Sequence, residues 1–178
     1  RSTLFPYTTL FRSENKNIYQ LTRENLKLTR ETASELLESI PPERIEKIEN
    51  ERSFPHPDEV LTMAEKYKKP DLCNYYCANQ CPIGQEYVPE IKIKDLSQIV
   101  LEMLASLNAM NKRKDRLIEI TADGKISDDE LEDFLYIQEE LERISITVET
   151  LQLWAEKMLA AGVIDEARYE AYRSRKKT

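Results

Sequence analysis

Apolar positions recur every three or four residues along most of the chain, which is the spacing of one face of an α-helix. In the N-terminal third, short segments of this kind are separated by turn signals and predict four helices. Thr29 is expected to cap the second helix, and Pro41–Pro42 suits the first turn of the third. Ile45 and Ile48 are the expected inward pair of that third helix. A small bundle of short helices is therefore predicted.

Two much longer helices are predicted in the C-terminal half, one from Asp95 to about Thr121 and one from Ser127 to about Ala161. The connection between them is short and contains Gly124, so the two helices should be antiparallel neighbours. We expect a helical hairpin with an apolar seam, followed by a short basic helix. The residues expected at the seam are Leu96, Ile99, Val100, Met103, Leu104, Leu107, Met110, Leu117 and Ile120 in the first helix, and Leu131, Phe134, Leu135, Leu141, Ile144, Val148, Leu151 and Trp154 in the second.

Between these regions the helical pattern is interrupted by cysteines, aromatic residues, Pro82, Gly84 and Pro89. A short helix near residues 72–79 and then a loop to about residue 92 are expected. Residues 1–13, "RSTLFPYTTLFRS", resemble the translation of a short-read sequencing adapter and are set apart as an artefactual or disordered leader. The predicted organisation is a helical domain at 14–72, a cysteine segment at 73–92 and the hairpin at 93–178. The predicted fold class is all-α.

Composition narrows the classes of function. Charged residues make up 33% of the 178 residues and glycine occurs only three times, which favours long helices. The net charge of −7 argues against nonspecific coating of nucleic acid or adhesion to an anionic membrane. No apolar run is long enough to span a bilayer, and three crowded cysteines fit a reducing cytosol. A cytoplasmic protein without a membrane segment is expected.

The segments "LTRETASELL", "RIEKIEN" and "DEVLTMAEKY", with a proline-containing turn before the last, fall within residues 17–72. They resemble the helix-turn-helix domain of the Cro/repressor (XRE) superfamily, and the resemblance covers about a third of the chain. It implies a lambda-repressor-like N-terminal domain in a bacterial transcriptional regulator. It also implies that the third helix enters the major groove of DNA as part of a dimer.

Carried over residue by residue, the resemblance places Pro42, Glu43 and Lys47 at the base edges, with Arg44 beside them. A lysine can donate to guanine and a glutamate can accept from cytosine. Phosphate contacts would fall to positive side chains on and near the second and third helices. The residues implied for DNA binding are Arg30, Pro42, Glu43, Arg44, Lys47 and Arg52.

Two features depart from the family pattern. Glu51 follows "IEN" where glycine is usual, and the turn "ESI" before the third helix is longer and lacks glycine. Residues 14–70 also carry ten Lys/Arg against twelve Asp/Glu, a net charge of −2. Weak binding as a monomer is expected, because neutralised phosphates drive such binding. An interaction module that kept the fold and lost DNA binding is the alternative.

Three cysteines stand at intervals of four, Cys73, Cys77 and Cys81, and would form one stripe on a continuous helix. Thiolates so placed are candidate ligands for zinc or an iron–sulfur cluster, with His56, the only histidine, as fourth ligand. A metal- or redox-sensing regulator and three simply packed thiols are the other interpretations.

Other motifs point to structure rather than chemistry. "EITADGKISDDE" is similar to a calcium-binding loop, but its first and third positions carry Glu119 and Thr121, so two of the usual carboxylate ligands are wrong or absent. Gly124 is therefore interpreted as a turn residue, and Ser127 with Glu130 as a capping box. No nucleophile–base pair, phosphate-binding glycine loop or small-molecule site is evident, and no enzyme is predicted. The hairpin is expected to join two copies of the chain.

Overall fold

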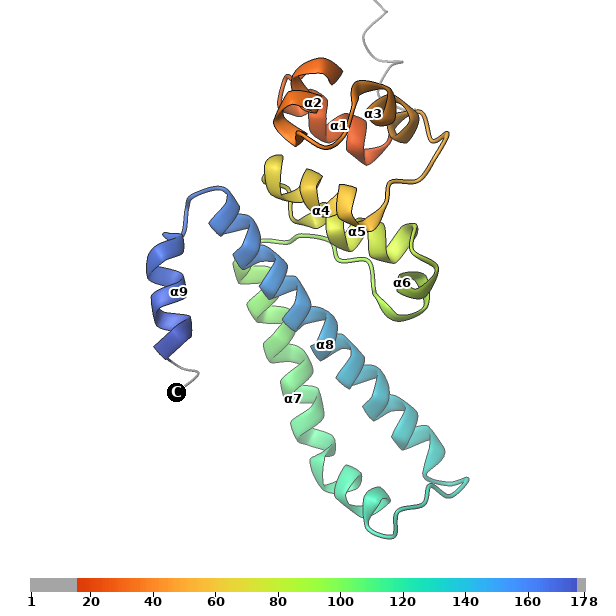
Figure 1. The fold of residues 1–178 in the computed structure, drawn as a ribbon. Coiled ribbons are helices and arrows are strands. Elements are labelled where there is room, and N and C mark those ends of the chain that lie inside the picture. Colours follow the sequence, from red (N-terminus) through yellow and green to blue (C-terminus); the bar gives the residue numbers. More distant parts are fainter. Residues whose placement is uncertain (1–15, 176–178) are drawn as a thin grey trace, which may run out of the picture. The chain divides into compact units, whose positions relative to one another are not determined.

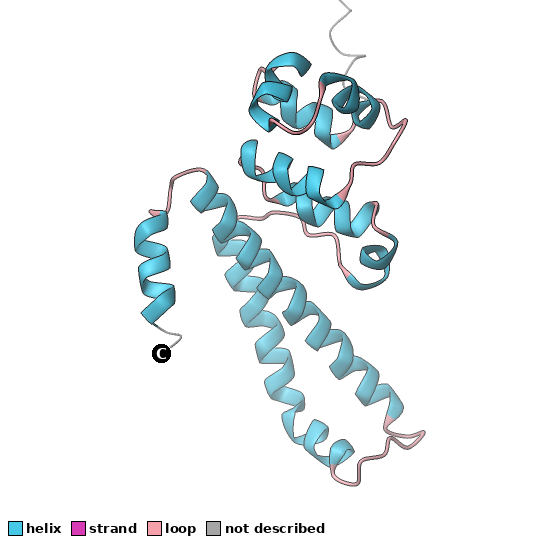
Figure 2. Ribbon diagram, in the orientation of Figure 1, coloured by secondary structure: helices cyan, strands magenta, loops and turns pink. Residues whose placement is uncertain are grey.

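The computed structural model describes residues 16–175, and within that range the chain forms nine helices and no strand (Figures 1 and 2). The predicted all-α class is confirmed. The leader predicted at residues 1–13 lies outside the described residues. The chain divides into two compact units, with the boundary between Val88 and Pro89. None of the helices in the described range is long and apolar enough to cross a membrane.

The first unit contains α1 (Ile18–Asn25), α2 (Arg30–Leu37), α3 (Pro42–Glu49), α4 (Pro57–Lys66), α5 (Asp71–Asn79) and α6 (Pro82–Tyr87). Buried apolar side chains from α1 to α5 form one core. Ile45 and Ile48 belong to it and are each 2% exposed, as predicted. Thr29 caps α2, because its hydroxyl accepts a hydrogen bond from the N–H of Thr32 at 3.2 Å. Pro42 is the first residue of α3, so both predicted starts are confirmed.

Each of the first four helices is followed by a residue with positive φ that is not glycine. These residues are Lys27, Glu38, Glu51 and Lys68, with φ between 53° and 59°. After α3, the N–H of Arg52 donates to the carbonyl of Lys47 at 2.9 Å and that of Glu51 to Ile48 at 3.1 Å. This pair of bonds is the Schellman helix end, which normally uses glycine because a Cβ strains the backbone there.

Residues 73–88 of the cysteine segment belong to the first unit, and the domain boundary predicted after residue 72 falls inside α5. Leu72 is fully buried in the core. The hydroxyl of Tyr19 donates to Oε1 of Gln80 at 2.8 Å and so joins α1 to the end of α5. Burial raises the pKa of this tyrosine well above its usual value, with smaller contributions from neighbouring tyrosines and cysteines.

The loop predicted over residues 80–92 is wrong in its first half, where α6 forms. Pro82 is the first residue of α6, a position where its missing N–H has no helical partner to lose. Gly84 lets α6 approach α5, because a Cβ there would stand 2.0 Å from the carbonyl oxygen of Cys77. Both residues therefore act as helix-start and packing residues, not as breakers.

The second unit contains α7 (Leu96–Thr121), α8 (Leu131–Ala160) and α9 (Glu166–Arg175). Helices α7 and α8 pack side by side and run antiparallel (Figure 1). Asp133 of α8 accepts from Arg113 at 2.6 Å and from Arg116 at 2.7 Å, which fixes the register of the pair. Ile99 and Ile120 are fully buried along the α7 side of their contact.

The predicted start of the second long helix is four residues early, because α8 begins at Leu131. Only one half of the expected capping box is present: the N–H of Ser127 donates to the carboxylate of Glu130 at 3.0 Å, while the N–H of Glu130 donates to the carbonyl of Ser127 instead of its hydroxyl. Gly124 has φ 72°, as expected for a tight turn, and the N–H of Lys125 donates to Asp123 at 2.9 Å. These contacts close the turn, as expected from its sequence.

Candidate nucleic-acid interface

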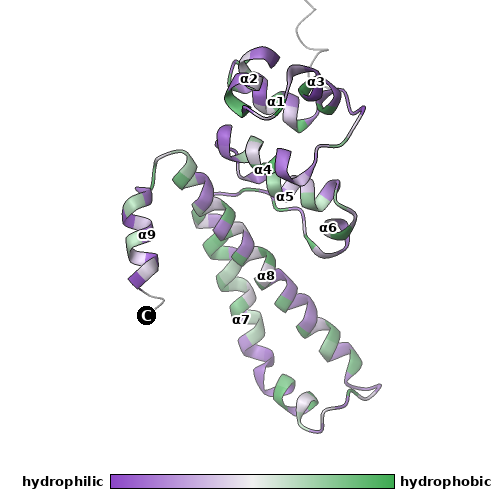
Figure 3. Cartoon of the chain, viewed as in Figure 1, coloured by the Kyte–Doolittle hydropathy of each residue, from purple (hydrophilic) through white to green (hydrophobic). Residues whose placement is uncertain are grey.

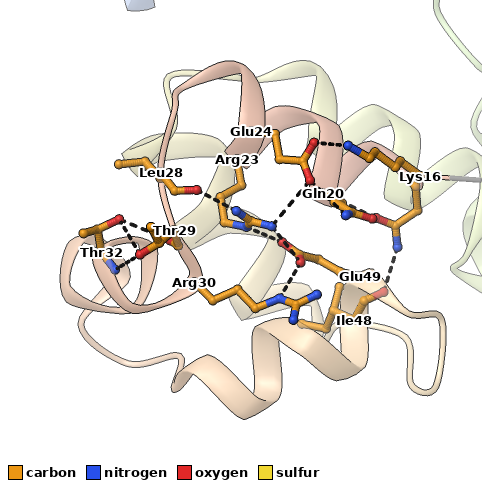
Figure 4. A network of polar contacts seen from close by, with 11 residues as sticks. Lys16, Gln20, Arg23, Glu24, Leu28, Thr29, Arg30, Thr32, Ile48 and Glu49 are labelled. Atoms are coloured by element: carbon orange, nitrogen blue, oxygen red, sulfur yellow. Dashed lines mark hydrogen bonds and ion pairs between the residues drawn. The ribbon is translucent and has the colours of Figure 1, made fainter. Parts of the chain in front are cut away.

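A buried ion-pair network fixes α3 against α1 and α2 (Figure 4). The carboxylate of Glu49, at the end of α3, has a side chain only 1% exposed. Arg23 of α1 donates to both of its oxygens, at 2.5 and 3.0 Å, and Arg30 of α2 donates to one of them at 2.8 Å. The hydrogen bond to Glu49 raises the pKa of Arg23. Two guanidinium groups on one carboxylate leave this network with a net charge of +1.

The network changes the role expected for Arg30. Its Nε is directed to Glu49, while its side chain remains 32% exposed. Arg30 therefore orients α3 and still leaves part of its guanidinium at the surface. Tyr67 lies near the same carboxylate; burial raises its pKa to about 12, and the charge of Glu49 adds to that rise.

Arg44, which the resemblance placed beside the base-reading residues as a DNA contact, is engaged within the protein. Its guanidinium donates to both oxygens of Glu59 at 2.7 Å, to the hydroxyl of Ser53 at 2.8 Å and to the carbonyl of Phe54 at 2.9 Å. Every guanidinium nitrogen is engaged, and the side chain is 18% exposed. Arg44 thus clamps α3 and the following turn to α4, which is a structural role.

The outward side of α3 carries Glu43 and Lys47, both exposed, with Pro42 half-buried at the start of the helix. Within residues 16–175 the structure gives Lys47 no ion pair or side-chain hydrogen bond. Asn50, exposed and three residues after Lys47, lies on the same side and was missed by the sequence analysis. Its amide is suited to adenine, and the spacing of three was the signal that pointed to it.

Acidic side chains outnumber basic ones around α3. Arg52 is 68% exposed and stands 3.9 Å from the carboxylate of Glu46, which also accepts from Asn50 at 3.3 Å. Glu43 and Glu51 are exposed as well. Lys47 and Arg52 are therefore the two cations of α3 and its end that remain available to a phosphate backbone.

The three cysteines do not lie on one continuous helix, so the stripe that such a helix would give is not formed. Helix α5 ends at Asn79, so Cys81 lies beyond it, at the start of α6. All three side chains are half-buried, and none forms a disulfide. Cys73 packs against the core of the first unit.

The predicted fourth ligand, His56, is exposed and precedes α4, where its backbone N–H donates to Glu59 at 2.6 Å. Across residues 16–175, no three His, Cys, Asp or Glu side chains are grouped so that they could hold a metal ion. The predicted set of Cys73, Cys77, Cys81 and His56 is thus not assembled, because the turn after α5 removes Cys81 from the row.

Comparison of the chain with protein-family models, curated proteins and solved structures gave no match.

Proposed function

We propose that the first unit is a helix-turn-helix domain of the Cro/repressor (XRE) type and that the chain is a bacterial, cytosolic regulator that binds specific DNA sequences as a dimer. The observation that carries the proposal is the combination of an anchored α3 and an exposed outward side. Glu49 and Arg44 hold the helix from both of its ends, while Glu43, Lys47 and Asn50 remain exposed. Side chains held in this way are suited to reading base edges.

In this proposal Lys47 and Asn50 read bases, Glu43 accepts from a cytosine, and Arg30 and Arg52 contact phosphate. Arg44 is assigned to the positioning of α3, since its guanidinium already donates to Glu59 and Ser53. Few phosphates are neutralised per copy, so two copies on two half-sites are needed for useful affinity.

The experiment is selection from a pool of random duplexes, followed by fluorescence polarisation with the enriched sequence. Lys47→Glu should weaken binding by about 10- to 100-fold, which corresponds to the loss of about 1–3 kcal/mol from a base contact. Lys125→Glu, in the tip between α7 and α8, makes the same change in net charge and should bind like the parent. Affinity should also fall steeply as salt rises.

A second candidate function, an interaction module that does not bind DNA, is favoured by the acidic surroundings of α3. Glu43, Glu46 and Glu51 outnumber the exposed cations there. Failure of the selection to enrich any sequence would decide for this module. Equal binding of an enriched sequence by the Lys47 and Lys125 variants would instead show that Lys47 does not read the DNA.

A further inference from the structure

The α7–α8 pair exposes more apolar surface than expected for two helices that bury their apolar residues against each other. Eight of the seventeen residues expected at its seam are exposed, and apolar residues follow both helices along much of their length (Figure 3). Seven of the eight are between 40 and 50% exposed, and six of these define what we call the open face: Leu96, Val100, Leu107, Leu131, Leu141 and Val148.

These residues lie on one side of the pair. Val100 follows buried Ile99, and Leu107 follows buried Ser106, by one position in α7. In α8, Leu141 follows buried Glu140 in the same way, and Val148 follows buried Thr147. One step along a helix turns the side chain by about 100° in a fixed sense. Because α7 and α8 run antiparallel, the same sense brings both rows to the same side of the seam.

The seam itself is partly polar. Glu140 is 3% exposed and is paired with Arg143, while Thr147 and Ser106 are 6% and 9% exposed. Polar groups are thus buried while leucines remain outside, which is the reverse of what the hydrophobic effect favours. A second layer of helices over the open face would correct this imbalance, as in a four-helix bundle.

The area of the open face fits one occupant, a second copy of the same surface. With the adjoining Met103, Met110 and Phe134, and with Leu104 and Leu135 at its edge, it offers on the order of 700 Å², close to the about 800 Å² that each partner gives to a standard interface. It exceeds the about 300–600 Å² patch of an ordinary monomer.

The spacing in α7 also suits self-pairing. Leu96, Val100, Met103, Leu107 and Met110 are distributed almost symmetrically about Met103. In an antiparallel two-fold contact, Val100 therefore meets Leu107 of the other copy and Met103 lies on the axis. A parallel contact would set the basic run 112–116 against itself, whereas the antiparallel contact separates the two runs.

We infer that two copies of this chain associate through the open face, with the two α7 helices antiparallel, to form a four-helix bundle. The proposed DNA binding rests on such a dimer, but the dimer is measured without DNA. The inference therefore fails or stands independently of the selection experiment.

The test is sedimentation velocity of the full chain over a range of concentrations. The parent should be a dimer, and Leu107→Glu should weaken the dimer by about 100-fold or more, because the two-fold axis places the buried carboxylate in the interface twice. The matched control is Leu101→Glu: Leu101 is 68% exposed but lies two positions after Ile99, away from the open face. This variant should remain a dimer, and far-UV circular dichroism should show unchanged helix content in both.

The orientation is tested by adding Val100→Lys to Leu107→Glu. In the antiparallel contact the introduced ammonium of one copy faces the introduced carboxylate of the other, so the double variant should recover at least about tenfold of the lost affinity. Within one chain the two positions are two helical turns apart and do not pair. Absence of recovery would overturn the antiparallel contact. A monomeric parent, or equal loss in the Leu101 and Leu107 variants, would overturn the dimer surface itself.

Discussion

Glu51 occupies a backbone conformation that most helix ends give to glycine. This departure can be recognised in the sequence because a family pattern exists for "IEN". Lys27, Glu38 and Lys68 also have positive φ, with the ψ of Glu38 at −45°, and nothing in their local sequence marks such a residue. With only three glycines in the chain, these helix ends rely on their hydrogen bonds and on core packing.

Replacing Glu51 with glycine should stabilise the first unit. Relief of the left-handed strain is worth about 1–2 kcal/mol, and the extra freedom of glycine in the unfolded chain removes part of it, leaving about 0.5–1 kcal/mol. Thermal and urea unfolding would measure the gain. Glu51→Ala removes the same carboxylate but keeps the Cβ, so it should give little or none of that gain; equal stabilisation by both would show that charge, not strain, is responsible.

At the scale of elements, the contact between α5 and α6 depends on the absence of one atom. A Cβ on Gly84 would overlap the carbonyl oxygen of Cys77, and backbone cannot move aside as a flexible side chain can. Gly84→Ala should therefore destabilise the first unit by about 2 kcal/mol or more, or detach α6 from it. Hydrogen exchange of α6 and the midpoint of urea unfolding would report either result. Ile83→Ala, at a position 72% exposed in the same helix, should leave both nearly unchanged.

The ion pair between Arg44 of α3 and Glu59 of α4 should lose its contribution to stability at acidic pH. Burial alone would raise the pKa of Glu59, but hydrogen bonds from Arg44 and from the N–H of His56 outweigh it, so the pKa lies below the usual 4.5. A carboxyl with a lowered pKa contributes stability above its unfolded pKa, and this contribution is lost as the pH falls through the folded value.

Glu59→Gln should cost about 1–3 kcal/mol at neutral pH, because the ion pair is lost while the guanidinium of Arg44 stays partly buried. The difference between parent and variant should narrow progressively below pH 4.5. Urea unfolding at several pH values would measure it. A difference that stays constant down to strongly acidic pH would contradict the assignment of this carboxylate.

At the scale of the whole molecule, helical periodicity predicted the all-α class and most helix positions in the described range. It could not predict which cations are engaged, because Arg44 and Glu59 are fifteen residues apart and meet only through the fold. Periodicity also does not show how many helices pack against an apolar stripe. For this reason the pattern assigns Leu107 to the seam between two helices, whereas the structure leaves it exposed. The resemblance gave α3 its candidate readers, while the network on Glu49 became visible only in the structure.

That network also limits how this chain can vary over generations. Glu49 serves Arg23 and Arg30 at once, so losing the carboxylate leaves two guanidinium groups without their shared partner, one of them almost fully buried. Changing either arginine first leaves a buried carboxylate with a single partner. Each single substitution at these three sites thus gives a less stable protein, and the effects of combined substitutions should be strongly epistatic. Among related chains, the three residues are then expected to be kept or replaced together, even where the exposed side of α3 diverges freely.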